Sequence, residues 1–397
     1  MKAGLYVHVP FCSSVCPYCD FAVTLAGEER RAEWERALLD EAAMYAECGF
    51  QFHTVYFGGG TPSALKIDRL ARVKDGLSEK VQIDPDAQVF IEVNPEDVTP
   101  ETARAWLDLG FSSVSVGVQA LNDVSLGILG RCHTAEQARR SIETLLDSGF
   151  QSVSLDLIFG LPGQARSVWE GQLREAAGLG VQHLSCYQLT FHEGTVFGKR
   201  REAGLMTELG EAPQADLYGT THEVLGATGF EGYEVSNFAL PGHRSVHNLK
   251  YWTGAPYLGL GPGAHSFNGV NKRWWNRRKV RLWQREIDQG RRPVEGKELL
   301  TAKQRALETL MLGMRTADGV DLAWLEKRFQ AGVITPNAGT LRDLEAKGLI
   351  SRQADRIAPT PAGMAVADAL ARALRIEGAE PEPEPVPVPV IVPDVRG

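Results

Sequence analysis

The stretch HVPFCSSVCPYCDF, residues 8–21, decides both the fold and the chemistry of this chain. It places Cys12, Cys16 and Cys19 within one short segment, directly after an apolar run that is typical of a buried β-strand. Active sites of parallel α/β barrels gather at the carboxyl ends of their strands. Thiolates spaced in this way on one loop are able to converge on iron or zinc. The loop is therefore a candidate metal centre.

The strand before this loop is the first of a repeating pattern. Short β-branched runs recur along the chain, and a loop and a longer helical pattern follow each of them. They cover residues 4–10, 53–59, 88–95, 112–119, 152–160 and 183–190. This alternation predicts parallel strands with right-handed crossovers. Because six units are too few for a closed eight-stranded barrel, we expect an α/β fold with an open, partial barrel. A doubly wound sheet is the alternative.

The helical segments carry recognisable end signals. Residues 134–150 begin at Thr134, a good N-cap, and their apolar residues follow helical spacing. Gly110, Gly149 and Gly229 each precede a Phe and end a helical pattern. The sequence predicts a left-handed glycine cap at all three.

Four regions are expected along the chain. Residues 1–231 are expected to form the partial barrel. Residues 232–298 are rich in glycine, proline and aromatics and are expected to form an irregular extension; long irregular segments in compact domains are usually functional. Residues 299–375 read as helices with a short strand pair, which indicates a small winged-helix-like domain. Residues 376–397 alternate proline with acidic and apolar residues, which predicts a disordered tail.

Charge and composition exclude some functions. The 397-residue chain has a formal net charge of -8, which argues against a nucleic-acid binder. One basic, Trp-containing run at 271–286 is interpreted as an amphipathic face, and stacking on a planar anionic ligand is its alternative. The sequence has neither a run long enough for a transmembrane helix nor a convincing signal peptide. We therefore expect a cytoplasmic protein, in which clustered cysteines indicate metal binding rather than disulfides.

The number of cysteines bears on which metal they bind. Zinc takes four ligands, and only His8 lies near enough in the sequence to add to the three thiols. Cys48, Cys132 and Cys186 are isolated and are interpreted as small buried apolar residues. Three thiolates suit a [4Fe-4S] cluster that leaves one iron open to another ligand.

The CxxxCxxC spacing, with Tyr18 before the third cysteine, resembles the signature of radical S-adenosylmethionine (SAM) enzymes. The resemblance implies that SAM binds the open iron through its amino and carboxylate groups. The GGGTP segment at 58–62 is similar to the superfamily element that contacts the SAM amino group. The residues that the resemblance assigns to the cofactors are Cys12, Cys16 and Cys19 for the cluster, and Tyr6, Tyr18, Gly59, Gly60, Thr61, Glu92, Gln119, Arg131 and Asp156 around SAM.

Residues 4–374 resemble the coproporphyrinogen dehydrogenase-like family, which has two branches. One contains oxygen-independent coproporphyrinogen III oxidases, and the other, the HemW branch, contains haem chaperones. The oxidase branch commonly has a further cysteine two positions after the third, but Phe21 stands there, and its longer N-terminal arm is not seen before Tyr6. The HNLKYW segment at 247–252 matches an HNxxYW element of the chaperone branch.

The resemblance to the chaperone branch implies haem as a ligand and haem-accepting proteins and a low-potential electron donor as partners, and the acidic charge predicts no nucleic-acid partner. His247 is the preferred candidate for the haem iron, and His243 and His265 are comparable ones. A DNA-binding regulator that uses the winged-helix-like end is a further alternative, which the acidic charge disfavours.

Overall fold

The computed structural model describes residues 2–378, so most of the proline-rich tail predicted at 376–397 lies outside the described residues. All six predicted strands are present, and they pair in parallel with their neighbours in chain order. They are β1 (Lys2–Val9), β2 (Gln51–Gly59), β3 (Ile83–Val93), β4 (Ser113–Gln119), β5 (Ser152–Phe159) and β6 (His183–Gln188). Since strand order follows sequence order throughout, the doubly wound alternative, which requires a reversal, does not apply.

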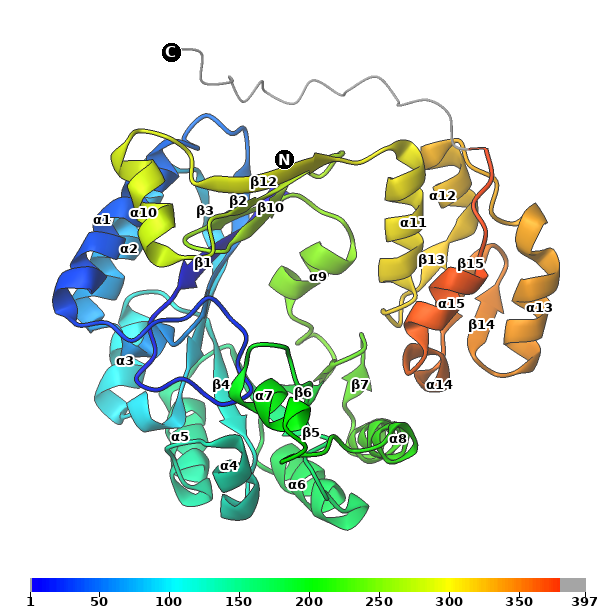
Figure 1. The fold of residues 1–397 in the computed structure, drawn as a ribbon, viewed down its shortest axis with the longest axis horizontal. Helices are drawn as coiled ribbons and strands as arrows, with labels where there is room; N and C mark the ends of the chain where they lie inside the picture. The colour runs from blue at the N-terminus through cyan, green and yellow to red at the C-terminus, as the bar shows by residue number, and fades with distance from the viewer. Residues whose placement is uncertain (1, 379–397) are drawn as a thin grey trace.

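Helices cover the outer face of these strands and give the molecule the crescent shape seen in Figure 1. Trp34, Trp106 and Trp169 are fully buried between these helices and the sheet. The helices are α1 (Glu28–Ala43), α2 (Ile67–Lys80), α3 (Pro100–Asp108), α4 (Asp123–Leu129), α5 (Ala135–Ser148), α6 (Arg166–Gly178) and α8 (Glu211–Ala227). The short helix α7 (Val196–Glu202) lies instead against the cysteine loop, where the Phe197 amide donates to the Pro17 carbonyl at 3.0 Å.

The predicted helix signals are confirmed. Thr134 caps α5 and exchanges hydrogen bonds with Gln137 in a capping box. Gly110, Gly149 and Gly229 have φ values of 81°, 93° and 89°, in the left-handed region.

The sheet extends beyond β1 and β6 but does not close into a barrel. Its strand order is β12-β11-β10-β9-β1-β2-β3-β4-β5-β6-β8-β7. The open partial barrel is therefore confirmed. β7 and β12 are its two edges, and α9 lies inside the concave face between them.

The prediction that residues 232–298 are irregular is wrong. β9 pairs in parallel with β1, and β10, β11 and β12 continue the sheet antiparallel. Because these strands are only three to six residues long, their period-2 alternation is too brief to stand out in the sequence. The elements are β7 (Glu231–Gly232), β8 (Asn237–Ala239), α9 (Val246–Trp252), β9 (Tyr257–Leu260), β10 (His265–Phe267), β11 (Lys272–Asn276), α10 (Val280–Asp288) and β12 (Val294–Leu299).

A buried carboxyl group ties this extension to the barrel. Glu41 of α1 accepts hydrogen bonds from the Gly261 amide (2.8 Å), the Asn276 side chain (2.6 Å) and the Trp283 indole (2.9 Å). Burial raises the pKa of Glu41 to about 8, although the three donors oppose that rise. The basic run at 271–286 contributes Trp274 and Trp283 to the same apolar core as β1. The extension and the barrel therefore share one core.

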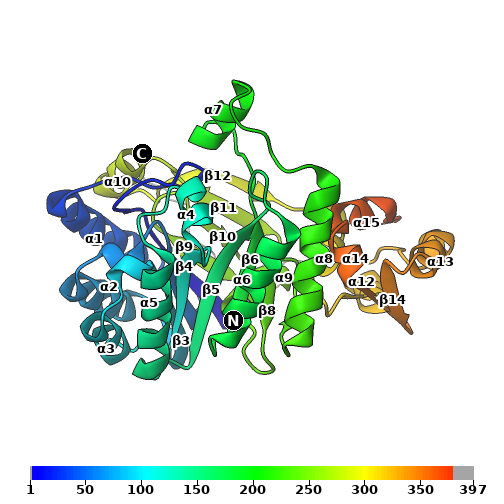
Figure 2. The ribbon, with the colours of Figure 1, turned by 90° about the horizontal axis from the view of Figure 1, so that it is seen from below.

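The residues after 299 form a second unit with its own apolar core. Figure 2 shows this unit at one side of the barrel, next to α8. Arg244 bonds Asp318, and Arg273 of β11 pairs with Glu308 across the boundary. The elements of this unit are α11 (Ala302–Gly313), β13 (Val320–Asp321), α12 (Leu322–Phe329), α13 (Ala338–Ala346), β14 (Ile350–Gln353), β15 (Arg356–Pro359), α14 (Pro361–Met364) and α15 (Ala367–Ala373).

The predicted C-terminal arrangement of helices and a small sheet is confirmed: β13, β15 and β14 form a three-stranded antiparallel sheet. Within residues 2–378, no helix combines the length and the apolar character that crossing a membrane requires.

Candidate functional site

A cavity of about 390 Å³ opens at the carboxyl ends of the parallel strands. It lies where the β1 loop, the β2 loop and the ends of β3 to β5 meet, as expected for this class of fold. Most of the predicted cofactor residues line it. These are Cys12, Cys16, Tyr18, Cys19, Gly59, Gly60, Thr61, Glu92, Gln119, Arg131 and Asp156.

The three cysteines occupy the loop after β1 as free, half-buried thiols. The Thr61 hydroxyl donates to the Cys12 sulfur at 3.5 Å, and an Arg131 Nη1 donates to the Cys16 sulfur at 3.3 Å. Donors aimed at sulfur favour the thiolate, which is the form that binds metal. Burial opposes this by raising the pKa of Cys12 and of Cys19. This donor set fits a thiolate-bound cluster.

The thiols are not arranged for a single ion. Among residues 2–378, no three His, Cys, Asp or Glu side chains are grouped closely enough to hold one metal ion. His8, which the zinc alternative requires, bonds the Ala22 carbonyl through Nε2 at 2.9 Å and the Tyr6 hydroxyl through Nδ1 at 3.1 Å. Burial lowers the pKa of His8 to about 4. Its ring is therefore a neutral, structural contact that holds the cysteine loop.

The glycines after β2 allow that loop to pass close to the cysteine loop. Gly59 has a φ of 111°, and a side chain there would collide with the His8 ring. A Cβ at Gly60 would lie 2.8 Å from the carbonyl oxygens of Val9 and Phe11. The Gly60 and Thr61 amides donate to those two carbonyls at 2.7 Å each. Glycine is thus required for the approach of the two loops.

Two half-buried carboxyl groups, Glu92 and Asp156, line the cavity. Glu92 accepts from the Gly59 amide and from the Tyr56 hydroxyl, both at 3.0 Å. Burial, and then the neighbouring Asp156, raise the pKa of Glu92 to about 7. Burial also raises the pKa of Asp156 to about 6, although the Ser115 hydroxyl donates to it at 3.1 Å. A cationic ligand would favour the ionised form of both groups.

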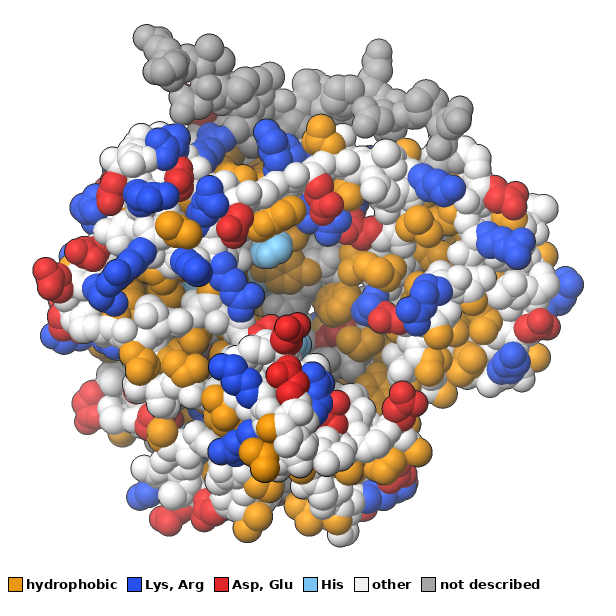
Figure 3. Space-filling view, viewed as in Figure 1, with side chains coloured by type: hydrophobic (Ala, Val, Ile, Leu, Met, Phe, Trp, Pro, Cys, Tyr) orange, Lys and Arg blue, Asp and Glu red, His pale blue; other side chains and the backbone are white. Residues whose placement is uncertain are grey.

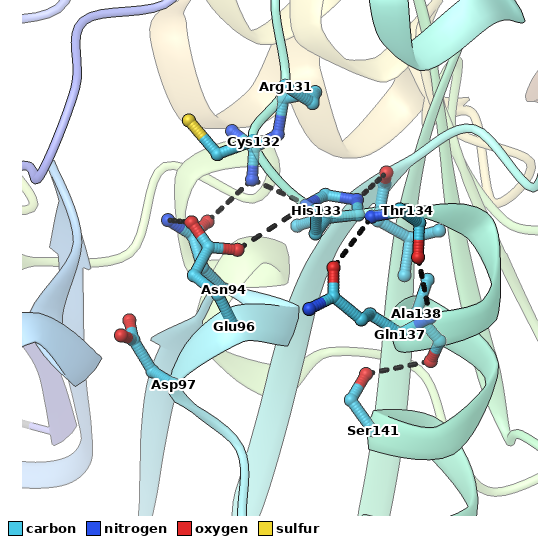
Figure 4. Close-up of polar contacts among 12 residues, drawn as sticks. Asn94, Glu96, Asp97, Arg131, Cys132, His133, Thr134, Gln137, Ala138 and Ser141 are labelled. Atoms are coloured by element: carbon cyan, nitrogen blue, oxygen red, sulfur yellow. Dashed lines mark hydrogen bonds and ion pairs between the residues drawn. The ribbon is translucent and has the colours of Figure 1, made fainter. Parts of the chain in front are cut away.

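Arg131 is held by residues from the end of β3, as Figure 4 shows. Its Nη2 donates to the Asn94 side chain at 2.7 Å and to the Gly117 carbonyl at 3.0 Å. Asn94 also contacts Glu96, which pairs with the buried His133 at 3.4 Å. The Arg131 Nε is buried without a partner in the described part of the chain. The guanidinium therefore has one N–H left to donate to an anionic group.

Two predicted residues lie outside the lining of this cavity. Tyr6 is directed toward β2, where its ring stacks on Tyr56 and its hydroxyl bonds His8. His247 of α9 is 1% exposed and packs against Tyr56 with ring centroids 5.1 Å apart.

The two nitrogens of His247 are both engaged. Nδ1 bonds the Thr54 hydroxyl at 2.9 Å and Nε2 bonds the Tyr251 hydroxyl at 2.8 Å. Burial lowers the pKa of His247 to about 3. As a haem ligand, His247 stays a prediction that requires one of these bonds to break. The HNxxYW segment instead supplies a core contact between α9 and β2.

Among the cavity residues that sequence reasoning did not assign to the site are Asn94 and Cys132. Asn94 follows directly after β3, so its place at a strand end was a usable signal. Cys132 was interpreted as buried, but it is exposed, lines the cavity and lies 3.4 Å from Ser14 of the cysteine loop. Its neighbour Arg131 points inward to Cys16, and this places Cys132 at the rim.

A second, smaller cavity of about 230 Å³ adjoins the first and shares Glu92, Asp156 and Tyr187 with it. Inward-facing serines of β4, β5 and β6 line it, in place of the bulky residues that usually fill a barrel interior. The interior of the barrel is therefore hollow and polar beneath the cysteine site.

Comparison with known proteins identifies the family to which this chain belongs. Residues 6–171 match the model of the radical SAM superfamily, and residues 300–366 match that of the HemN C-terminal domain. The chain is 32% identical to heme chaperone HemW of Lactococcus lactis over 90% of its length and 93% of the relative. It is 35% identical to heme chaperone HemW of Mycobacterium tuberculosis over 94% of both chains.

The chain belongs to the HemW family. As a member of the radical SAM superfamily, it has the fold that carries a [4Fe-4S] cluster and SAM. The coproporphyrinogen III oxidase HemN of Escherichia coli has a similar structure, with a TM-score of 0.81 over 94% of this chain and 89% of that one. Because the sequence identity to it is only 22%, this likeness is one of fold.

Proposed function

We propose that this protein is a haem chaperone that binds haem and passes it to acceptor proteins. The observation that carries the proposal is its similarity, along nearly the whole chain, to several proteins named heme chaperone HemW. Phe21, in the position where the oxidase branch commonly has a further cysteine, supports the same choice. Cytoplasmic location and partnership with a low-potential electron donor belong to this proposal.

In this proposal Cys12, Cys16 and Cys19 hold the cluster. When bound, the cluster supplies one-electron reduction and an open iron for SAM. Thr61 and Arg131 hold hydrogen bonds on the cysteine sulfurs, which influence a cluster's reduction potential. Gly59 and Gly60 keep the β2 loop open to the cavity. Glu92 and Asp156, which line the cavity, would attract the cationic part of SAM, and Arg131 would pair with its carboxylate.

The other predicted cofactor residues are Tyr18, Gln119 and Tyr6. Tyr18 packs against Phe197 of α7, with ring centroids 6.2 Å apart. Gln119 ends β4 with a φ of 65°, unusual for a residue with a side chain. Strained backbone of this kind concentrates at functional sites. Tyr6 acts one step away, through Tyr56, which donates to Glu92.

A haem titration of the anaerobically reconstituted protein, with and without SAM, tests the proposal. We expect stoichiometric haem uptake and transfer of the haem to an apo-acceptor. The same preparation, incubated with coproporphyrinogen III, SAM and a reductant, should yield no protoporphyrinogen. Turnover to protoporphyrinogen would instead assign the chain to the oxidase branch.

A further inference from the structure

The basic run at 271–286 has a part that neither the core nor the cysteine site uses. Two of its three tryptophans are buried in the core of the barrel, and the third, Trp275, stacks on His265 of the neighbouring strand. Because the indole rings are engaged in packing, the alternative in which this run stacks on a planar ligand loses its support. Charge remains at the surface. Residues 277–285 contain five Arg or Lys residues and no Asp or Glu, in a chain whose formal net charge is -8.

Three of these cations are free to meet a partner. Arg278, Lys279 and Arg281 are exposed and have no ion-pair partner within residues 2–378. The two acidic residues of α10 are each paired with another arginine, so they do not neutralise these three charges. We call Arg278, Lys279 and Arg281 the cationic patch. Figure 3 shows Lys and Arg side chains gathered over α10, at the left of the view.

The cationic patch lies beside the cysteine loop. A Cβ at Gly263 would lie 3.8 Å from Arg278 and 3.2 Å from the side chain of Ala22, three residues after Cys19. Besides burial, the charge of Arg278 lowers the pKa of His8, whose ring bonds the Ala22 carbonyl at 2.9 Å. The turn that carries the patch is therefore packed against the segment that follows the third cysteine.

The cysteine loop adds exposed apolar side chains next to this charge. Val15 and Phe21, which line the cysteine cavity, are 50% and 64% exposed, and Leu25 is 56% exposed. The acidic residue of the loop, Asp20, lies 3.8 Å from His192, which follows β6. An apolar centre with a charged border is the usual composition of a protein–protein interface. The mouth of the cavity and the patch together have this composition.

An electron carrier is a partner that has to reach this surface. The cluster that the three cysteines are proposed to hold lies at the end of β1, and the rate of electron transfer falls steeply with distance. A carrier must therefore dock over the cysteine loop. The cationic patch then lies at the border of that contact, where charge sets the orientation and the association rate. Nucleic acid is a poorer match, since the charge of the whole chain is acidic.

We propose that the cationic patch, together with Phe21 and Leu25, is the docking surface for the electron donor, and that this donor is a small acidic protein with a low-potential flavin or iron–sulfur centre. In the docked pair the donor is oxidised by one electron and the cluster is reduced by one. The inference rests on the proposed function, which includes such a donor, and it adds the surface and the charge of the partner.

Stopped-flow reduction of the anaerobically reconstituted full-length protein tests this surface. The reductant is the hydroquinone form of a flavodoxin, an acidic flavin protein, and the readout is the visible absorbance of the cluster. At low salt, reversing the three charges of the patch should lower the second-order rate at least about tenfold. Added salt should slow the wild type and leave the variant nearly unchanged. The variant is Arg278→Glu, Lys279→Glu and Arg281→Glu.

A variant with the same net charge is the matched control. It reverses three cations of the C-terminal domain that are exposed and equally unpaired in the described structure, Lys327→Glu, Arg342→Glu and Lys347→Glu. Flavodoxin should reduce it as fast as the wild type. Dithionite, a small reductant that needs no docking surface, should reduce the cluster equally in all three proteins. Iron and sulfide content should also be equal.

The outcomes separate this assignment from the proposed function. Equal rates for the patch variant and the wild type, equal slowing of both triple variants, or a wild type that only dithionite reduces would each overturn the docking surface. If the patch variant instead loses only binding to vesicles of phosphatidylglycerol, the patch belongs to a lipid surface and the assignment is overturned as well. If the wild type takes up no haem but the difference between the two triple variants remains, the haem-chaperone function fails and the docking surface stands.

Discussion

The parallel half of the sheet, β1 to β6, and its extension, β9 to β12, belong to one hydrogen-bonded sheet but position their functional side chains differently. In the parallel half every strand ends at the same edge of the sheet, so polar residues at the ends of successive strands lie close together. In the antiparallel extension a side chain reaches one face or the other according to register. The CxxxCxxC motif therefore suffices to locate the cysteine cavity. In the extension, the position of a side chain depends on how the strands are paired.

The largest expected effect is loss of the cluster, and it tests whether the three cysteines at the end of β1 bind it together. Replacing Cys16 with Ala should abolish the visible absorbance of the cluster after anaerobic reconstitution. The two remaining thiolates are too few to hold a cluster that three thiolates bind. Cys132→Ala is the matched control, since this thiol lines the same cavity but lies at its rim. Iron and sulfide content measured alongside the spectrum check the result. An unchanged spectrum for Cys16→Ala would remove Cys16 from the ligand set.

The next effect tests the register of the extension. Trp274 is 3% exposed, stacks on Tyr45 and donates its indole N–H to the Tyr45 hydroxyl at 3.2 Å. Trp274→Ala should therefore cost about 3–5 kcal/mol in the free energy of unfolding. Its neighbour Trp275 points to the other face, and Trp275→Ala should cost about 1 kcal/mol or less. Urea unfolding of both variants measures the difference, and equal losses would contradict the register.

His247 sharpens the comparison because it joins the two halves. Its ring connects α9 to Thr54 of β2, and His247→Ala would leave the Thr54 and Tyr251 hydroxyls unpaired in the core. We expect a loss of about 2–4 kcal/mol in the free energy of unfolding, measured by urea unfolding, with iron content intact. His243→Ala should change the stability by less than about 0.5 kcal/mol. A His247→Ala protein as stable as the wild type would show that this ring is not a core contact.

The sequence predicted the parallel half well and the extension poorly, for a physical reason. Each strand–loop–helix unit carries its own signals: an apolar run, a cap such as Thr134, and a terminal glycine such as Gly149. These local signals located the six strands, and the resemblance to the radical SAM signature supplied the predicted residues of the cavity lining. Long-range contacts were not visible in the sequence, as for Glu41, whose three donors lie more than 200 positions later in the chain. The burial of His247 likewise depends on β2, a distant segment.

The smallest effect concerns the carboxyl groups that the parallel half concentrates at one edge. The pKa of Glu92 is raised to about 7 in the folded protein, so the folded state binds a proton more tightly than the unfolded state, where the pKa is about 4.3. Through Glu92 alone, the unfolding free energy should therefore fall by up to about 3 kcal/mol as the pH rises from 4.5 to 7, whereas the buried His8 and His247, with pKa values of about 4 and about 3, change it in the opposite direction. Asp156, with a pKa near 6, adds to the lower part of this window.

Urea unfolding over this pH range, on protein without cluster or SAM, measures that loss. Glu92→Gln keeps an acceptor for the Gly59 amide but cannot ionise, so the unfolding free energy of the wild type relative to this variant should fall by up to about 3 kcal/mol between pH 4.5 and 7. The exposed Glu47→Gln is the control and should follow the wild type. Identical curves for Glu92→Gln and the wild type would mean that Glu92 ionises as freely in the fold as in the unfolded chain. The edge of the parallel half would then be far more hydrated than its packing indicates.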